Sequence, residues 1–202
     1  GFMTNQRKLD SLFNTDPLFE LLNKHCDFTK IKKNLQNEII ESFVITANNY
    51  TNSTAVSFVQ TSTARLTWKD SRRLAVLSEI GAEHIMASSS IPMLFPPIKI
   101  GSHFYGDGCV RNMTPCSPAI RLGADKLFVI GVRTKMNSEI SNRSLQSENI
   151  KAPSIIKIIN TLLNAVLLDS VEQDVVRIQR INQLVELAGA NPKLSSEFKA
   201  IP

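Results

Sequence analysis

The sequence has few cysteines, and their spacing excludes a disulfide scaffold. Only three occur, Cys26, Cys109 and Cys116, an odd number without a CxxC pair. Disulfide-rich small folds and structural zinc sites both need clusters at characteristic spacings. The set His103, Asp107, Cys109 and Cys116 matches no zinc spacing. We therefore expect inert thiols, no metal ion and no other cofactor.

The sequence also lacks a long apolar run. The most apolar stretch, residues 155–168, is interrupted by Lys157 and two asparagines, whereas a transmembrane helix needs about 20 consecutive apolar residues. The first residues show no signal-peptide pattern. Basic and aromatic residues are not interleaved as in RNA-binding surfaces. We expect a cytoplasmic or peripheral membrane location, without a nucleic-acid partner.

What is present is the composition of a globular domain, with 43% hydrophobic and 20% charged residues and a net charge of +5. Periodicity and turn residues predict mixed secondary structure. The expected elements are a helix from Asp16-Pro17, strands at 41–48 and 55–61, a helix at 70–88, a hairpin at 98–105, a helix at 115–122, a buried parallel strand at 127–132, a polar loop at 137–149, and helical periodicity from 153 to 188 that a break near 169–170 could divide. Helices alternating with apolar strands indicate a layered α/β domain.

Four sequence blocks resemble the signatures of one family, the patatin-like phospholipases. Residues 87–97 (ASSSIPMLFPP) resemble its ASxAIPxxFPP signature, and residues 104–115 (FYGDGCVRNMTP) its (Y/F)xDGGxxxNxP block. Residues 115–125 (PCSPAIRLGAD) resemble its PxxxAxxxGAD run, and residues 9–18 (LDSLFNTDPL) its D-T-S-P-L helix start. The resemblance covers about residues 9–134, in the family's order and spacing.

The resemblance implies a patatin-like α/β/α fold and a lipid acyl hydrolase with a Ser–Asp dyad, in which Asp107 is the catalytic aspartate. Two of the family's signals, a Gly-rich oxyanion loop and a G-x-S-x-G nucleophile elbow, do not occur in this sequence. Cys109 replaces the second glycine after the aspartate, and Met113 stands where the family has asparagine. We therefore expect a single domain over residues 1–202 that corresponds to the C-terminal portion of a patatin-like domain, followed by a helical tail at 153–190.

Two interpretations of Asp107 follow. Gly-Asp-Gly by itself is ordinary turn chemistry, and a carboxylate with a pKa near ~4 is a weak base unless burial raises that pKa. If Asp107 is catalytic, the substrate is a phospholipid or another lipid ester, and the nucleophile resides upstream in the same gene product. The alternative is an inactive remnant that binds lipid or a protein partner. Such a remnant would form an oligomer or pair with a complementing N-terminal segment, since an incomplete sheet exposes an edge strand.

Two segments are candidates for peripheral membrane contact, the turn Phe95-Pro96-Pro97 and the helical region 155–185. Amphipathic helices more often pack against their own domain than against lipid. We therefore expect burial of the apolar side of the C-terminal helical region.

Overall fold

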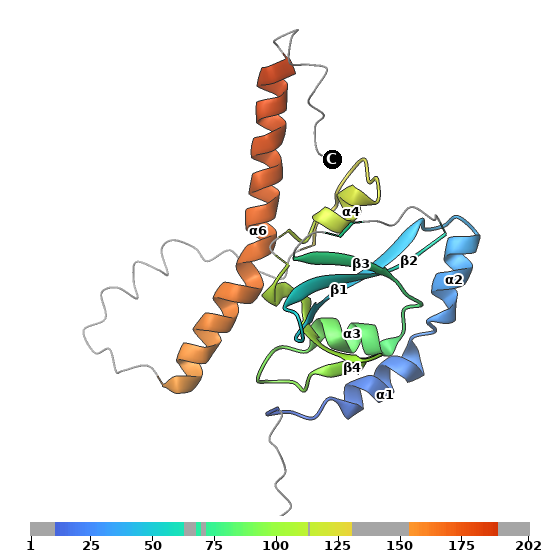
Figure 1. Cartoon of the computed structure of the whole chain (residues 1–202), viewed down its shortest axis with the longest axis vertical. Coiled ribbons are helices and arrows are strands. Elements are labelled where there is room, and N and C mark those ends of the chain that lie inside the picture. Colours follow the sequence, from blue (N-terminus) through green and yellow to red (C-terminus); the bar gives the residue numbers. More distant parts are fainter. Residues whose placement is uncertain (1–10, 63–67, 70–71, 113, 131–153, 190–202) are drawn as a thin grey trace, which may run out of the picture. The chain divides into compact units, whose positions relative to one another are not determined.

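The computed structural model describes residues 11–62, 68–69, 72–112, 114–130 and 154–189 (Figure 1). The chain divides into two compact units. Residues 1–113 and 117–123 form the first unit, and residues 114–116 and 124–202 form the second. The first unit contains the sheet, and the second contains the long C-terminal helix.

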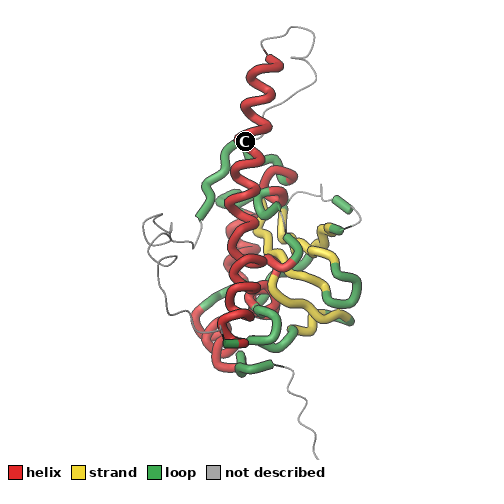
Figure 2. The backbone as a smooth tube through the Cα atoms, turned by 90° about the vertical axis from the view of Figure 1, so that its left-hand side faces the viewer, coloured by secondary structure: helices red, strands yellow, loops and turns green. Residues whose placement is uncertain are grey.

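The first unit is built around a mixed five-stranded sheet (Figure 2). Its strands are β1 (Ser42–Asn49), β2 (Thr54–Thr61), β3 (Arg73–Leu77), β4 (Ile98–Ile100) and β5 (His103–Asp107). Their order in the sheet is β3-β2-β1-β5-β4. The pair β2–β3 is parallel, and all other neighbours are antiparallel. Gly101 adopts the positive φ of 59° that the tight β4–β5 turn requires.

Short helices accompany this sheet. They are α1 (Asp16–His25), α2 (Thr29–Gln36), α3 (Ala82–Ser89), the 3₁₀ helix η1 (Gly108–Val110) and α4 (Ser117–Arg121). Helix α3 packs on β1, β4 and β5, and α1 packs on α3. The core lies between α3 and the sheet, where Ala47, Val56, Phe58, Ala87 and Tyr105 form one buried cluster. Val56 and Phe58 share this face because side chains alternate along a strand.

The second unit contains helix α6 (Ile155–Gly189), which is 35 residues long. Its Asp174 is only 4% exposed, and Asp174 Oδ2 accepts a hydrogen bond of 3.0 Å from the Cys116 backbone N–H. This bond ties α6 to the segment 114–116 of the same unit. The helix continues through residues 169–170, so the break considered there does not occur. No helix in the described part of the chain has the length and hydropathy of a membrane span.

The structure confirms the mixed α/β class, the strand pair of β1 and β2, the hairpin of β4 and β5, and the helices begun at Asp16 and near residue 115. It contradicts two predicted elements. The first half of the helix expected at 70–88 is instead strand β3, because its apolar residues pair in parallel with β2. Residues 127–130 form no strand, and Phe128 is 91% exposed. Residues 131–132 and the polar loop predicted at 137–149 lie outside the described residues.

Candidate active site

Asp107 is the last residue of β5 and lies beside the middle of the sheet. It pairs with Ala47 of β1, and its backbone N–H donates a 2.9 Å hydrogen bond to the Ser90 carbonyl oxygen. Its side chain shares a sheet face with Tyr105, two residues earlier, and therefore with the buried core under α3. Asp107 is only 8% exposed. The residue is thus part of a packed site and not of an exposed hairpin turn.

The Asp107 carboxylate accepts a hydrogen bond from the residue two positions later in the chain. Its Oδ1 accepts a 2.8 Å hydrogen bond from the Cys109 backbone N–H at the start of η1. Burial raises the pKa of Asp107 above its ordinary value, and the hydrogen bonds from Cys109 oppose this shift. Because burial is the larger effect, the carboxylate is a stronger base than one in water.

Cys109 is the nearest thiol to this carboxylate. Desolvation and the adjacent Asp107 charge raise the pKa of the Cys109 thiol to about 11. A thiol reacts as its thiolate, and at neutral pH this one stays protonated. Cys109 therefore serves Asp107 as a hydrogen-bond donor and is a poor nucleophile.

Gly108 allows the chain to turn against β1. A Cβ atom on Gly108 would overlap the Thr46 carbonyl oxygen and lie 2.8 Å from the Thr46 carbonyl carbon. Both atoms belong to the backbone of a central strand, which cannot yield as a side chain can. The glycine after the aspartate is thus required by close packing.

The three serines before the signature proline do not present free hydroxyl groups. Ser88 Oγ donates to the Thr46 carbonyl oxygen at 2.8 Å, and Ser90 Oγ donates to the Met86 carbonyl oxygen at 2.7 Å. Ser89 Oγ donates to the Ile85 carbonyl oxygen at 2.9 Å. These hydroxyls hold the end of α3 in place, and the carbonyl of Ser90 in turn positions Asp107.

Two residues of this neighbourhood were not found from the sequence. The Tyr50 hydroxyl lies over Gly106, and burial together with the Asp107 charge raises the pKa of Tyr50. Asn48, opposite Gly106, is 4% exposed, and its Oδ1 has no hydrogen-bond partner among the residues that the structure describes. Asn48 lies in β1 and Tyr50 directly follows this strand, in an Asn-rich segment that carries no functional pattern, so only the pairing of β1 with β5 reveals them.

One further serine, Ser78, lies outside this site and is close to a histidine and a carboxylate. Ser78 Oγ lies 3.0 Å from His84 Nε2, and Glu83 Oε1 lies 3.2 Å from His84 Nδ1. Ser78 also lines a groove of about 450 Å³ at the ends of β2 and β3. However, the Gly81 backbone N–H donates to His84 Nδ1 at 3.1 Å, which places the imidazole proton on Nε2. His84 then donates to Ser78 and cannot deprotonate it.

This role of His84 predicts a pH-dependent stability. Burial lowers the pKa of His84 below its ordinary value of 6.5. The neutral ring therefore contributes stability that is present above pH 6.5 and is lost as the pH falls below it. We expect His84→Gln to flatten the dependence of melting temperature on pH between 7 and 5, since glutamine at the third helical position can still accept from the Gly81 N–H.

The exposed His25 provides the matched control for this measurement, because His25→Gln should leave the pH profile as in the wild type. Thermal unfolding followed by circular dichroism gives the melting temperatures. A His84→Gln profile as steep as that of the wild type would show that another group causes the acid sensitivity.

Comparison with protein-family models assigns the part of the chain that contains the sheet to a family. The family model for patatin-like phospholipase matches residues 2–120, more than half of the chain and the whole segment that carries Asp107 and its neighbours. No curated protein and no solved structure was found to match the chain. The match ends before α6 and includes all five strands of the sheet. The chain therefore belongs to the patatin-like phospholipase family, a family of lipid acyl hydrolases.

Proposed function

We propose that Asp107 is the general base of a Ser–Asp dyad that hydrolyses carboxyl esters of lipids. The observation that carries this proposal is the buried carboxylate, whose pKa is raised and whose Oδ1 is fixed by the Cys109 N–H. The other oxygen, Oδ2, receives no backbone hydrogen bond from the described residues, and it is the atom that can accept a proton. The sequence contains no G-x-S-x-G motif. In this proposal the nucleophilic serine of the dyad therefore belongs to a segment outside this sequence.

The chemistry assigns Asp107 two proton transfers in each half of the reaction. Asp107 takes the proton of the serine hydroxyl as the serine oxygen bonds to the ester carbonyl carbon. The tetrahedral intermediate collapses, the bond to the alcohol breaks, and Asp107 returns the proton to the leaving alkoxide. In the second half, Asp107 takes a proton from water as the water oxygen bonds to the acyl carbon. The bond from that carbon to the serine oxygen then breaks, Asp107 returns the proton to the serine, and the fatty acid leaves. Backbone N–H groups must stabilise the oxyanion, since each such donor contributes about 100-fold or more.

A second candidate function is a catalytically inactive module that binds lipid or a protein partner. The observation that favours it is the absence of the nucleophile motif from the sequence, together with the use of Ser88, Ser89 and Ser90 for structural hydrogen bonds. A base without a nucleophile transfers no acyl group. In that case the burial of Asp107 only preserves an inherited fold.

Release of fatty acid separates the two candidates. The chain is assayed alone and joined to any coding sequence that precedes residue 1 in its gene, with a phospholipid, a lysophospholipid and a neutral glyceride as substrates. Ester hydrolysis by the joined protein that Asp107→Asn lowers by about 100-fold or more supports the dyad. Binding of these lipids by both forms, with no fatty acid released by either, supports the inactive module.

A further inference from the structure

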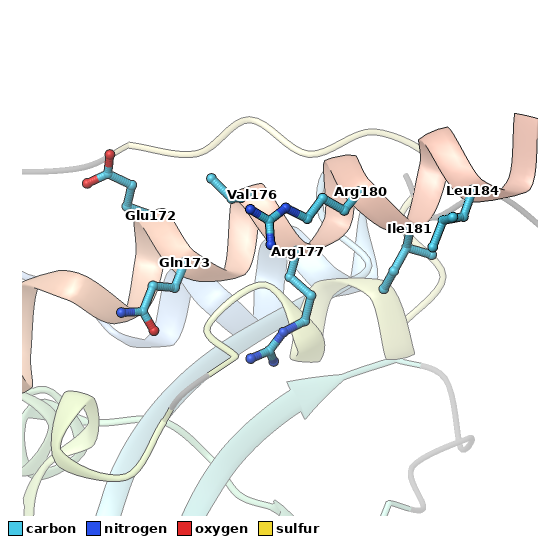
Figure 3. A pocket seen from close by; sticks show the side chains of 7 residues that line it. All are labelled: Glu172, Gln173, Val176, Arg177, Arg180, Ile181 and Leu184. Carbon is cyan, nitrogen blue, oxygen red and sulfur yellow. The ribbon is translucent and has the colours of Figure 1, made fainter.

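The second half of α6 carries a groove on its exposed side (Figure 3). The groove has a volume of about 600 Å³, and the described residues that line it all belong to this helix. Val176, Arg180 and Leu184 recur every four residues, which places them on one stripe. Leu187 continues the stripe beyond the groove. Val176, Leu184 and Leu187 are 39%, 64% and 73% exposed.

The opposite side of the helix is the packed one. Asp174, which accepts the Cys116 N–H, is buried there, and Val171 and Ile178 beside it are half-buried. Val176, Leu184 and Leu187 therefore lie away from the side that carries Asp174, whereas Ile181, which also lines the groove, is half-buried. The expected burial of the apolar side of the C-terminal helical region stays a prediction, because most side chains of its first half lie outside the described residues. An exposed apolar stripe on a helix with a separate packing side indicates an interaction surface.

Two cations line the groove. Arg177 and Arg180 both line the groove and are exposed, and neither has an ion-pair partner among the described residues. Figure 3 shows their guanidinium groups at a similar level along the helix axis. The acidic lining residue, Glu172, stands at the N-terminal end of the groove, beyond Val176. The centre of the groove is thus positive, with apolar residues before and after the arginines along the helix.

This pattern is complementary to the surface of an anionic membrane. Guanidinium groups bind phosphate oxygens in a bidentate manner. The valine and leucines can enter the boundary between headgroups and acyl chains, while the long arginine side chains reach up to the phosphates. An acidic protein would satisfy the arginines but would leave this apolar stripe in contact with polar surface.

We infer that the groove of α6 formed around Arg177 and Arg180 docks onto anionic phospholipid at a bilayer surface. The inference goes beyond the proposed ester hydrolysis, because docking needs neither Asp107 nor a nucleophile. Docking holds the protein against the bilayer and is measured without turnover, so its failure and a failure of the hydrolysis proposal are distinguishable.

Sedimentation with vesicles tests the inference on the full chain. The vesicles contain phosphatidylcholine alone or phosphatidylcholine with phosphatidylglycerol. We expect binding to the anionic vesicles, and we expect the double variant Arg177→Gln/Arg180→Gln to weaken it by about 10- to 30-fold, since each basic residue near such a surface contributes on the order of fivefold. The matched control is Lys126→Gln/Lys157→Gln, which removes two exposed cations of the same unit outside the groove. It should weaken binding by no more than about twofold.

The apolar part of the docking surface is tested separately. Leu184→Ser/Leu187→Ser should weaken binding to anionic vesicles even at high salt, where the contribution of the arginines is screened. Equal binding of the arginine variant and the lysine control would overturn the inference. So would binding of inorganic phosphate or polyglutamate through these arginines without vesicle binding, because the site would then be one for free phosphate or for an acidic protein.

Discussion

Asp107→Asn should lower lipid-ester turnover by about 10²- to 10⁴-fold, the contribution typical of a general base. Asparagine keeps an oxygen that can accept the Cys109 N–H, so the local backbone is retained, but it cannot take a proton from a hydroxyl at neutral pH. The variant is measured in the hydrolytically competent protein by fatty-acid release. The loss should appear in kcat, since the interaction is made in the transition state.

The same substitution should raise stability at neutral pH. Burial raises the folded-state pKa of Asp107, so the folded protein holds this proton more tightly than the unfolded chain does. The ionised carboxylate therefore destabilises the fold above that raised pKa, and this effect disappears as the pH falls below the ordinary value of 3.8. Asp107→Asn should melt above the wild type at pH 7, and the difference should shrink towards pH 4.

Asp125→Asn serves as the control, because Asp125 is an exposed carboxylate outside the site. It should change neither turnover nor the melting temperature. If Asp107→Asn retains wild-type kcat, Asp107 is not the base. If it lowers kcat and also melts well below the wild type, the loss reflects unfolding, and the assignment of a catalytic role loses its support.

Gly108→Ala should destabilise the first unit by about 1–3 kcal/mol or more, the range found for overpacked positions. The added methyl group meets the Thr46 carbonyl, which belongs to the strand that pairs with both β2 and β5. No side-chain rotation relieves this contact, so β1 or η1 must move. Each kcal/mol corresponds to about 2–4 °C in melting temperature for a chain of this size, which differential scanning calorimetry resolves readily.

Gly101→Ala separates packing from backbone strain. Gly101 has a positive φ, but a Cβ atom there would meet nothing within 4 Å. The substitution should therefore cost only the strain of a left-handed alanine, about 1–2 kcal/mol. If Gly108→Ala proves no more destabilising than Gly101→Ala, close packing against Thr46 does not explain the glycine after the aspartate.

Asp107→Asn and Gly108→Ala test the same part of the site. The first changes the buried carboxylate, and the second changes the turn that follows it. A carboxylate becomes a useful base only where water is largely excluded, and here the exclusion comes from backbone contacts. The turn at Gly108 brings η1 against β1, and the Ser90 carbonyl holds the Asp107 N–H. Precise placement of the carboxylate thus depends on elements that are far apart in the sequence.

Local signals predicted the parts of the fold that depend on neighbours in the chain. Gly101-Ser102 between two alternating runs predicted the β4–β5 hairpin, and Asp16-Pro17 predicted the start of α1. The strands β1 and β2 were predicted from their β-branched residues and the polar segment between them. In each case the pattern and the contact that stabilises it lie within about 20 residues, so short-range chemistry is sufficient.

Long-range pairing decided the elements that were predicted wrongly. Residues 73–77 fit a helical pattern together with 82–85, yet they form β3 because residues 55–59 offer a parallel edge. Residues 127–130 have the composition of a buried strand, but no strand of the described chain pairs with them. An apolar run becomes a strand only where a neighbour satisfies its backbone hydrogen bonds, and composition does not report that neighbour.

The sequence alone determined the family and made Asp107 the candidate base, because Gly106-Asp107-Gly108 follows the proline-rich segment at the spacing of the family's signatures. Only the tertiary structure decided that the carboxylate is buried, that Gly108 contacts the Thr46 carbonyl, and that Tyr50 and Asn48 lie nearby. The physical reason is the same throughout. Spacing along the chain encodes which residues can act, whereas burial and pKa depend on what the antiparallel pairing of β1 with β5 brings next to them.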